Sequence, residues 1–286
     1  MDNILEVKGL VKKYPKFTLD HVSFSLPEGC VTGFIGANGA GKTTSIKSIL
    51  GLINKDSGSI RIFGMDAEEH LQEIKDRIGI VMDDSYFFND LSMKEMKSIL
   101  APAYSRWSDE DYQTWMDKFE LDPAQKIATL SSGMKMKFAL VLALSHQAEL
   151  LIMDEPTSGL DPLARNQFLD IVMDYMRNGG KGVFFSTHIT TDLEKIADML
   201  ILINEGKIIF ERNKDELLDT FRIVKGNGEW LNDQNRPLIK NLKVSSYGFS
   251  GITDHVAEVK KELPEAVFEK AMIEDIMIAY IRGVRK

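Results

Sequence analysis

Short apolar runs separated by turn residues begin the chain, and longer segments with helical spacing follow them. Residues 4–7 and the alternating stretch 21–26 predict two strands, and Pro-Glu-Gly at 27–29 predicts the turn that ends the second. The mostly apolar residues 30–35 are typical of a strand buried within a parallel sheet. A glycine-rich loop comes next, and the pattern of residues 42–52 predicts a helix directly after it.

The middle of the chain changes to helices that are rich in charged and aromatic residues, from about residue 83 to residue 130. Ser108 stands three residues before Asp111, which resembles a helix-capping box with Asp in place of the usual Glu. Apolar strands return at residues 150–153 and 182–185. Strands that alternate with helices predict an α/β fold around a mostly parallel sheet, here with a helical insertion.

The strong motifs stop after roughly residue 212, and the last quarter of the chain has a different pattern. Polar turn residues at 225–228 and a closing helical pattern at 269–281 predict a small additional unit. We therefore predict a main domain over residues 1–211, with a helical subdomain at about 83–145, and a C-terminal extension over residues 212–286.

Composition and charge narrow the class of protein only moderately. The 286 residues are 44% hydrophobic and 27% charged, which is ordinary for a globular protein with a sizeable core. The net charge of −8 argues against a nucleic-acid partner, because such proteins usually present a basic face, although a local basic patch is compatible with it. The single Cys30 has no partner for an internal disulfide, which fits a reducing cytoplasm.

Neither a targeting segment nor a membrane span is indicated by the sequence. The first residues lack the positive charge and the apolar run of a signal peptide. The longest apolar region, residues 138–153, is too short to cross a bilayer and contains His146, Gln147 and Glu149. If the protein works at a membrane, we expect another chain to supply the membrane-spanning part.

A phosphate-binding loop is the strongest motif in the sequence. Residues 36–43, GANGAGKT, match G-x-x-x-x-G-K-[ST] at every specified position and lie between a predicted strand and a predicted helix. The glycines allow backbone N–H groups to turn inward around phosphate oxygens, and the helix points its positive dipole end at the same place. Lys42 is expected to neutralise phosphate charge, and the Thr43 hydroxyl to bind Mg²⁺. The predicted nucleotide-binding residues of this region are Gly36, Ala37, Asn38, Gly39, Ala40, Gly41, Lys42, Thr43 and Thr44.

Two carboxylates after the strand at 150–153 are candidates to complete this site. The strand carries Asp154 to the carboxyl edge of a parallel sheet, where ligands bind in open α/β folds, and we expect Asp154 to reach Mg²⁺. Glu155 follows directly and is the candidate that polarises the attacking water. An acidic pair at a strand end is often only solvated, and the phosphate loop upstream is what favours a catalytic role here.

Several motifs together resemble those of ABC transporter ATPases, in the same order and with similar spacing over roughly residues 4–210. Residues 154–162, DEPTSGLDP, look like the Walker B motif and D-loop of that family. Residues 130–135, LSSGMK, stand where the family has its signature motif, and His188 follows a strand as the family's switch histidine does. Tyr14 lies where an aromatic residue stacks on adenine. The resemblance implies a P-loop NTPase core with an N-terminal antiparallel β region and a helical signature subdomain.

The resemblance also implies a mechanism that needs two ATPase subunits. In the family two such domains dimerise head to tail, and each ATP lies between one subunit's phosphate loop and the other's signature motif. Ser131 and Gly133 would then face the γ-phosphate across the dimer, and Asp161 would communicate between the two sites. His188 would contact the γ-phosphate and hold the attacking water near Glu155. The predicted catalytic residues are therefore Glu155, His188 and Lys42.

The sequence departs from the family's pattern at two places. Ser132 stands where Gly is usual and Met134 where Gln is frequent, a version that resembles many bacterial exporter ATPases. Asp83 stands where the family generally has Gln or Glu, a residue that reaches Mg²⁺ and senses the membrane partner. Because the aspartate side chain is shorter, we expect Asp83 to reach the metal through water rather than directly.

Three of these assignments have a simpler structural alternative. Tyr14 could be an ordinary surface or core aromatic, and His188 an incidental loop histidine. Residues 86–88, Tyr-Phe-Phe, could be local core, or they could line a groove that receives a cytoplasmic helix of the membrane partner. The sequence alone leaves these alternatives open.

Other classes of nucleotide-binding protein fit the sequence less well. The guanine-reading Asn-Lys-x-Asp of GTPases is missing, since residues 54–57 and 213–216 both fail at the fourth position. A regulator with little turnover would not need both Glu155 and His188. The serious alternative is a soluble, non-transport ABC ATPase that acts on a protein or nucleic-acid assembly.

The prediction is therefore the ATP-binding and ATP-hydrolysing subunit of an ABC transporter, with ATP and Mg²⁺ bound. Residues 273–280 resemble a segment near the end of single-domain exporter ATPases, which favours export. The expected partners are a membrane-spanning transporter subunit and a second ATPase subunit, either a copy of this chain or a relative, and no nucleic acid. The expected location is cytoplasmic, peripheral on the inner face of the cell membrane.

Overall fold

A computed structural model describes residues 2–82, 87–177, 179 and 181–283. A six-stranded sheet lies at its centre, and the predicted parallel arrangement is confirmed, because all strands run parallel except one at the edge. The inner strands are buried on both faces, which explains their nearly continuous apolar sequence. In spatial order the strands are β10 (Lys207–Asn213), β9 (Met199–Asn204), β3 (Cys30–Ile35), β8 (Gly182–Thr187), β7 (Leu150–Asp154) and β6 (Ile78–Met82).

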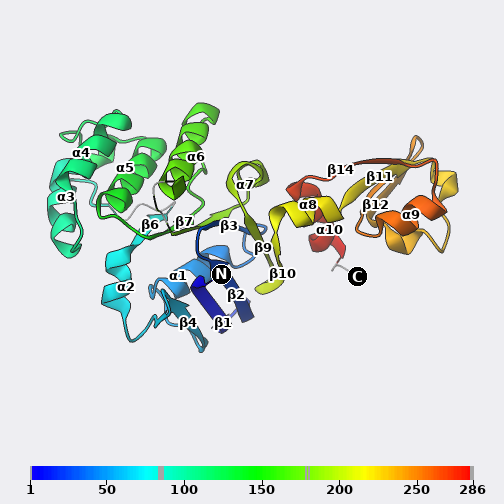
Figure 1. The fold of residues 1–286 in the computed structure, drawn as a ribbon, viewed down its shortest axis with the longest axis horizontal. Helices are drawn as coiled ribbons and strands as arrows, with labels where there is room; N and C mark the ends of the chain where they lie inside the picture. The colour runs from blue at the N-terminus through cyan, green and yellow to red at the C-terminus, as the bar shows by residue number, and fades with distance from the viewer. Residues whose placement is uncertain (1, 83–86, 178, 180, 284–286) are drawn as a thin grey trace.

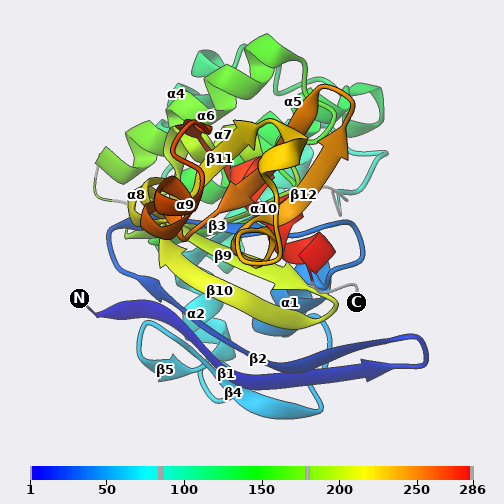
Figure 2. The same cartoon turned by 90° about the vertical axis from the view of Figure 1, so that its right-hand side faces the viewer.

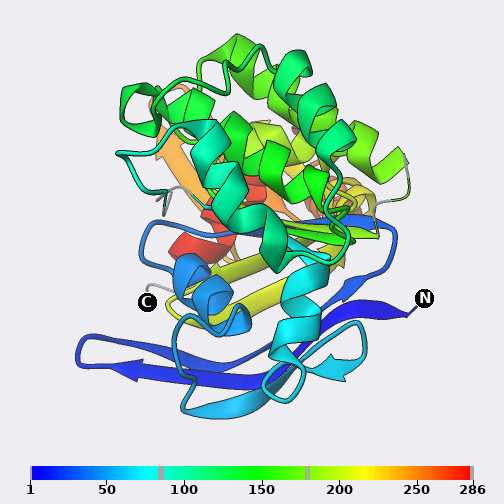
Figure 3. The ribbon, with the colours of Figure 1, turned by 90° about the vertical axis from the view of Figure 1, so that its left-hand side faces the viewer.

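An antiparallel sheet covers one face of the central sheet, together with helix α1 (Lys42–Ile49) (Figure 3). Every second side chain of its strands points toward the central sheet. Phe24 of β2, for example, packs on Phe34 and on Phe184, with ring centroids 5.5 Å apart in both pairs. The first predicted strand is longer than its apolar residues indicate, because it forms a long hairpin with the second. In spatial order the strands are β2 (Phe17–Pro27), β1 (Asn3–Tyr14), β4 (Ser57–Ile62) and β5 (Met65–Asp66).

Helices cover the opposite face and extend beyond the β6 edge (Figure 1). The second half of α5 (Ser132–Ser145) is buried from residue 138 onward, as its apolar sequence predicts. Ser108 caps α4 (Asp109–Lys118): its Oγ accepts a hydrogen bond from the Asp111 N–H at 3.0 Å, which is one half of a capping box. In the described part of the chain, no helix is both long and apolar enough to cross a membrane. The remaining elements are α2 (Leu71–Arg77), α3 (Met93–Leu100), α6 (Pro162–Arg177), α7 (Thr190–Ile196) and the 3-10 turns Ala101–Ala103 and Ile127–Thr129.

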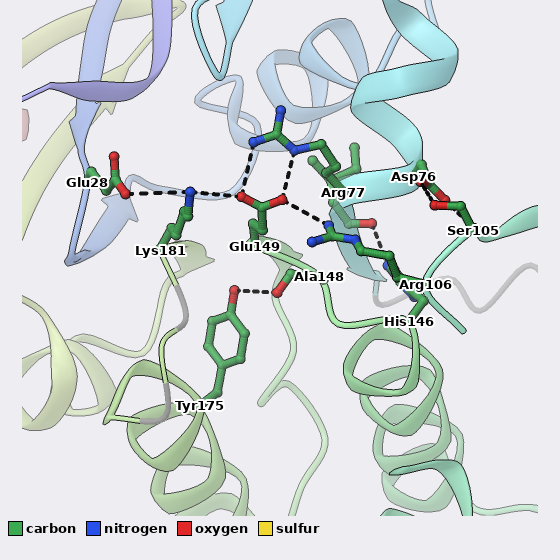
Figure 4. A network of polar contacts seen from close by, with 11 residues as sticks. Glu28, Asp76, Arg77, Ser105, Arg106, His146, Ala148, Glu149, Tyr175 and Lys181 are labelled. Carbon is green, nitrogen blue, oxygen red and sulfur yellow. Dashed lines mark hydrogen bonds and ion pairs between the residues drawn. The ribbon is translucent and has the colours of Figure 1, made fainter. Parts of the chain in front are cut away.

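A charged cluster around Glu149 joins the helical layer to the central sheet (Figure 4). Arg77, at the end of α2, donates two hydrogen bonds to the Glu149 carboxylate at 2.8 and 3.0 Å. Arg106 and Lys181 lie 2.9 and 3.0 Å from the same carboxylate. Arg77, whose hydrogen bonds are the largest cause, and Lys181 lower the pKa of Glu149 to about 2. The cluster ties α2, the segment before α4 and the starts of β7 and β8 together.

The C-terminal region forms a small antiparallel sheet with its own apolar core beyond α8 (Lys214–Thr220) (Figures 1 and 2). The sequence pattern does not predict this sheet. Residues 225–226 lie in a strand rather than a turn, and residues 269–270 lie in a strand rather than in the closing helix. Such short strands with mixed polar faces have little periodicity to read. The strands are β12 (Lys240–Ser245), β13 (Gly248–Thr253), β11 (Arg222–Gly226) and β14 (Val267–Lys270), with helices α9 (Val256–Glu262) and α10 (Ile273–Gly283) and the 3-10 turns Gly228–Trp230 and Arg236–Leu238.

Candidate functional site

The carboxyl ends of three neighbouring strands, β3, β8 and β7, meet at one edge of the central sheet. The phosphate loop follows β3, His188 follows β8, and Asp154 ends β7 with Glu155 directly after it. Motifs that lie far apart in the sequence are therefore brought to one place by the strand order, as is usual for ligand sites of open α/β sheets.

The phosphate loop has the backbone that its glycines allow. Gly39 and Gly41 have φ values of 80° and 117°, which residues with a Cβ rarely adopt. A Cβ at Gly36 would lie 2.5 Å from the Ile203 carbonyl oxygen, so this position has no room for a side chain. Lys42 is 6% exposed, and its Nζ donates to the Gly36 carbonyl at 2.8 Å. The loop therefore keeps the lysine folded back over its own backbone.

A cavity of about 600 Å³ opens at the phosphate loop, with Glu155 and His188 also lining it. Lys16, in the turn between β1 and β2, and Phe17, the first residue of β2, line the cavity too, and sequence reasoning missed them. Tyr14 is 43% exposed and is not among the lining residues, although it pairs with Phe17 across the hairpin. The sequence indicates an aromatic residue near Tyr14, and the pairing of the hairpin shows that Phe17 is the aromatic residue beside it that lines the cavity. The loop residues that line the cavity are Asn38, Gly39, Gly41, Lys42, Thr43 and Thr44, whereas Gly36, Ala37 and Ala40 belong to the loop without lining it.

Asp154 and Thr43, the two predicted metal ligands in the described residues, both carry suitable oxygen atoms, but only Thr43 lines the cavity. Asp154 is 4% exposed, and its Oδ1 accepts a hydrogen bond from the Ser186 hydroxyl, which orients the carboxylate. Asp154 ends the strand next to the cavity, and Thr43 is one of the residues that line it. Carboxylate and hydroxyl oxygens are ligands that suit Mg²⁺, so these residues fit the expected ion. Asp83, the third predicted ligand, lies outside the described residues.

Glu155 is held at the centre of the site by both its backbone and its side chain. Its φ is 50°, in the left-handed region, and its N–H donates to the Ser186 carbonyl at 3.0 Å. Its Oε1 lies 3.1 Å from Lys42 Nζ. Its Oε2 lies 2.7 Å from His188 Nδ1 and accepts a hydrogen bond from the His188 backbone N–H at 3.2 Å. Glu155 is therefore in direct contact with both of the other residues expected to be catalytic, Lys42 and His188.

The signature residues lie outside this cavity, at the start of α5. Ser131 caps that helix, since its Oγ accepts a hydrogen bond from the N–H three residues on, at 3.2 Å. Gly133 faces the D-loop, because a Cβ there would lie 3.1 Å from Leu160 Cδ2. Asp161 caps α6, and the hydrogen bond from the Ala164 N–H is the main cause that lowers the pKa of Asp161. Within one chain, Ser131 and Gly133 are thus not brought to the phosphate loop.

The aromatic run before α3 is divided between core and surface. Phe87 packs on Phe138 of α5, with ring centroids 5.2 Å apart, as a local core residue does. Phe88 is 62% exposed, which leaves its ring available to a partner. Tyr86 lies outside the described residues.

The fold and the cavity define a P-loop nucleotide triphosphatase. The family model described as "ABC transporter" matches residues 19–158. The bacitracin transport ATP-binding protein BcrA of Bacillus licheniformis is 33% identical over 246 residues, which cover 84% of this chain and 78% of the relative. The linearmycin resistance ATP-binding protein LnrL of Bacillus subtilis (strain 168) is 30% identical over 278 residues, which cover 94% of this chain and 88% of the relative.

A solved structure described as the ATP-binding subunit of an ABC transporter has the same fold, with a TM-score of 0.69 and 29% identity over 76% of this chain and 92% of that one. The chain belongs to the ABC transporter family, as an ATP-binding subunit that hydrolyses ATP. The predictions of family, fold class and ATPase activity are confirmed. Because both relatives are named for transport or resistance, the non-transport alternative is not favoured.

Proposed function

We propose that ATP binds in this cavity with its triphosphate on the phosphate loop and its base toward the β1–β2 hairpin. The inward N–H groups of the loop and the start of α1 supply positive potential for the phosphates. Lys42 Nζ, which contacts Gly36 and Glu155, would exchange the glutamate for a phosphate oxygen. Phe17 lines the cavity and Tyr14 pairs with it, so this end of the hairpin supplies the aromatic surface for adenine.

Glu155 is the proposed general base for hydrolysis. Once Lys42 Nζ has moved from Glu155 to a phosphate oxygen, Glu155 Oε1 can accept a proton from the attacking water, while Oε2 stays hydrogen-bonded to His188. The His188 side chain is 46% exposed, so its other ring edge can reach the γ-phosphate. The observation that carries this proposal is the shared Glu155 carboxylate, which lies 3.1 Å from Lys42 and 2.7 Å from His188.

Thr43 and Asp154 are the proposed protein ligands of Mg²⁺. When bound, Mg²⁺ would neutralise charge on the β- and γ-phosphates. Ser186 holds the Asp154 carboxylate in position for this contact, and its carbonyl also fixes the backbone of Glu155. One strand end therefore orients both acidic residues.

We further propose that two ATPase subunits complete each site together, in the head-to-tail arrangement. Ser131 and Gly133 lie at the N-terminus of α5, away from the cavity of their own chain. The N-terminus of a 14-residue helix favours an anion, so the partner subunit's α5 suits the γ-phosphate. The second subunit is a copy of this chain or a related ATPase.

The proposed task of this dimer is to power export by a membrane-spanning subunit at the inner face of the cell membrane. The names of the two relatives, bacitracin transport and linearmycin resistance, support export. The exposed Phe88 supports a docking position for the membrane partner. In this proposal the membrane-spanning partner selects the cargo that is exported.

The transport part is tested by isolating the tagged chain from its native membranes in mild detergent and identifying its partners by mass spectrometry. We expect a stoichiometric multi-span membrane protein. Recovery only from the soluble fraction, or together with ribosomes or nucleic acid, would contradict transport and leave the ATPase assignment intact.

A further inference from the structure

Helix α7, which follows the switch histidine, lies between the ATPase site and the C-terminal extension (Figure 1). On the side of the site, the buried Asp192 of α7 accepts a hydrogen bond from the Thr157 hydroxyl at 2.6 Å. Thr157 is two residues after Glu155, and His188, two residues before α7, contacts the Glu155 carboxylate. The position of α7 is therefore linked to the catalytic carboxylate from two directions.

On the side of the extension, Glu194 of α7 accepts two hydrogen bonds. The backbone N–H of Ile273, the first residue of α10, donates to Glu194 Oε1 at 3.1 Å. The Nζ of Lys214, the first residue of α8, donates to the Glu194 backbone carbonyl at 3.2 Å. A carboxylate at a helix N-terminus pairs an N–H that lacks an intrahelical acceptor and faces the positive end of the dipole. Glu194 therefore caps α10 from another element.

Apolar packing keeps α10 in this place. Ile273 and Ile276 are completely buried, in the same core as Leu193 of α7. Tyr280 packs on Phe210 of β10, with ring centroids 5.3 Å apart. The last helix of the extension is thus part of the surface on which α7 rests, and a close-packed contact of this kind transmits a shift instead of absorbing it.

We propose that Glu194 is a positioning residue, through which the C-terminal extension holds α7 and the switch histidine in the arrangement that supports hydrolysis. This inference rests on the proposed roles of Glu155 and His188. Among the residues whose side chains the structure describes, neither Glu194 nor any part of α10 lines the nucleotide cavity. The extension therefore acts on the rate of turnover and not on the binding of ATP.

The test measures steady-state ATP turnover of the full chain for Glu194→Ala and Glu194→Gln beside two matched controls. The glutamine variant keeps an acceptor oxygen for the Ile273 N–H. Lys195→Ala removes a neighbouring contact of α7, the 2.6 Å hydrogen bond to Asn166. Asp275→Ala removes the capping contact that α10 makes within its own first turn, without touching α7.

We expect Glu194→Ala to lower kcat about three- to tenfold while KM for ATP stays within about twofold. Glu194→Gln should retain most of the turnover, and both controls should remain near the unmodified chain. In the alanine variant, hydrogen–deuterium exchange should become faster over residues 187–196 and 273–276. The reason is that both α7 and α10 lose the hydrogen bond that joins them.

Unchanged turnover in Glu194→Ala would overturn the proposal, as would an equal loss in either control or a loss that glutamine does not rescue. His188→Ala is measured in the same series. If His188→Ala leaves turnover unchanged, the proposed role of His188 itself is wrong. If His188→Ala is nearly inactive while Glu194→Ala matches the unmodified chain, only the positioning role of the extension is wrong.

Discussion

The ATPase region and the C-terminal extension differ in how their sequences carry function. In the ATPase region the proposed reacting groups follow strand ends in recognisable motifs, and the strand order brings them together. The extension has no such motif, and it acts through packing and one capping contact on α7. The comparison teaches that motifs locate the reacting groups, whereas packing determines which other parts of the chain hold them in place.

Lys42→Ala should give the largest effect on ATP binding, because it removes the cation at the centre of the ATPase site. The lysine Nζ lies 3.1 Å from Glu155 and is the proposed partner of the phosphates. We expect ATP affinity to fall about 10- to 100-fold, the loss typical for a hydrogen bond to a charged group. Binding of a fluorescent ATP analogue measures it. Lys47→Ala, on the same helix but away from the cavity, is the control, and equal affinities in the two variants would contradict the proposed site.

The sequence predicts the ATPase region well because its chemistry depends on short spacings. The loop of Lys42 and the pair Asp154–Glu155 are fixed by neighbours along the chain, so a motif is enough to locate them. Phe17, which we propose contacts the base, is identified only from the pairing of β1 with β2. Glu194 and Ile273 are 79 residues apart, and no pattern in either segment indicates that they meet. The sheet of the extension is missed for a similar reason, since its short strands are stabilised by tertiary packing.

Glu149→Gln tests how the ATPase region is held together. The folded pKa of Glu149, about 2, lies below the ordinary 4.5, so this carboxylate stabilises the fold fully above about pH 4.5 and loses its contribution as pH falls toward 2. We expect the variant to lose about 2 kcal/mol of unfolding free energy at pH 7 and to converge with the unmodified chain at low pH. Urea unfolding at several pH values measures both.

Glu269→Gln is the matched control in the extension, where it removes the exposed pair with Lys225. Its expected loss is below about 0.5 kcal/mol, because exposed ion pairs contribute little. If both glutamine variants lost the same stability, the partly buried cluster around Glu149 would not connect the helical layer to the central sheet as we describe.

Phe88→Ala compares two exposed aromatic surfaces as docking positions for the membrane partner. Because Phe88 is 62% exposed, we expect recovery of the partner to fall about tenfold with ATP binding unchanged. Tyr247→Ala, at a 99% exposed tip of the extension, should have no effect. Quantitative mass spectrometry of the isolated complex measures both. A loss caused by Tyr247→Ala instead would move the docking surface to the extension.

Phe17→Ala and Tyr14→Ala give the smallest expected effect. They test whether the aromatic residue at the base is Phe17, as the cavity indicates, or Tyr14, as the family resemblance implies. Because Phe17 lines the cavity and Tyr14 does not, we expect Phe17→Ala to raise KM for ATP about threefold and Tyr14→Ala to change it less. Initial-rate kinetics at several ATP concentrations measure KM. The reverse order would show that Tyr14 turns into the cavity when the nucleotide binds.

The most direct test of the central claim is Glu155→Gln, with ATP binding and ATP turnover measured on the same preparation. The substitution keeps the size of the side chain and removes the proton acceptor that lies between Lys42 and His188. We predict that turnover falls about 100-fold or more while ATP still binds, because general-base catalysis contributes on this scale. Substantial turnover in Glu155→Gln would contradict the account, since the base would then have to be a different group.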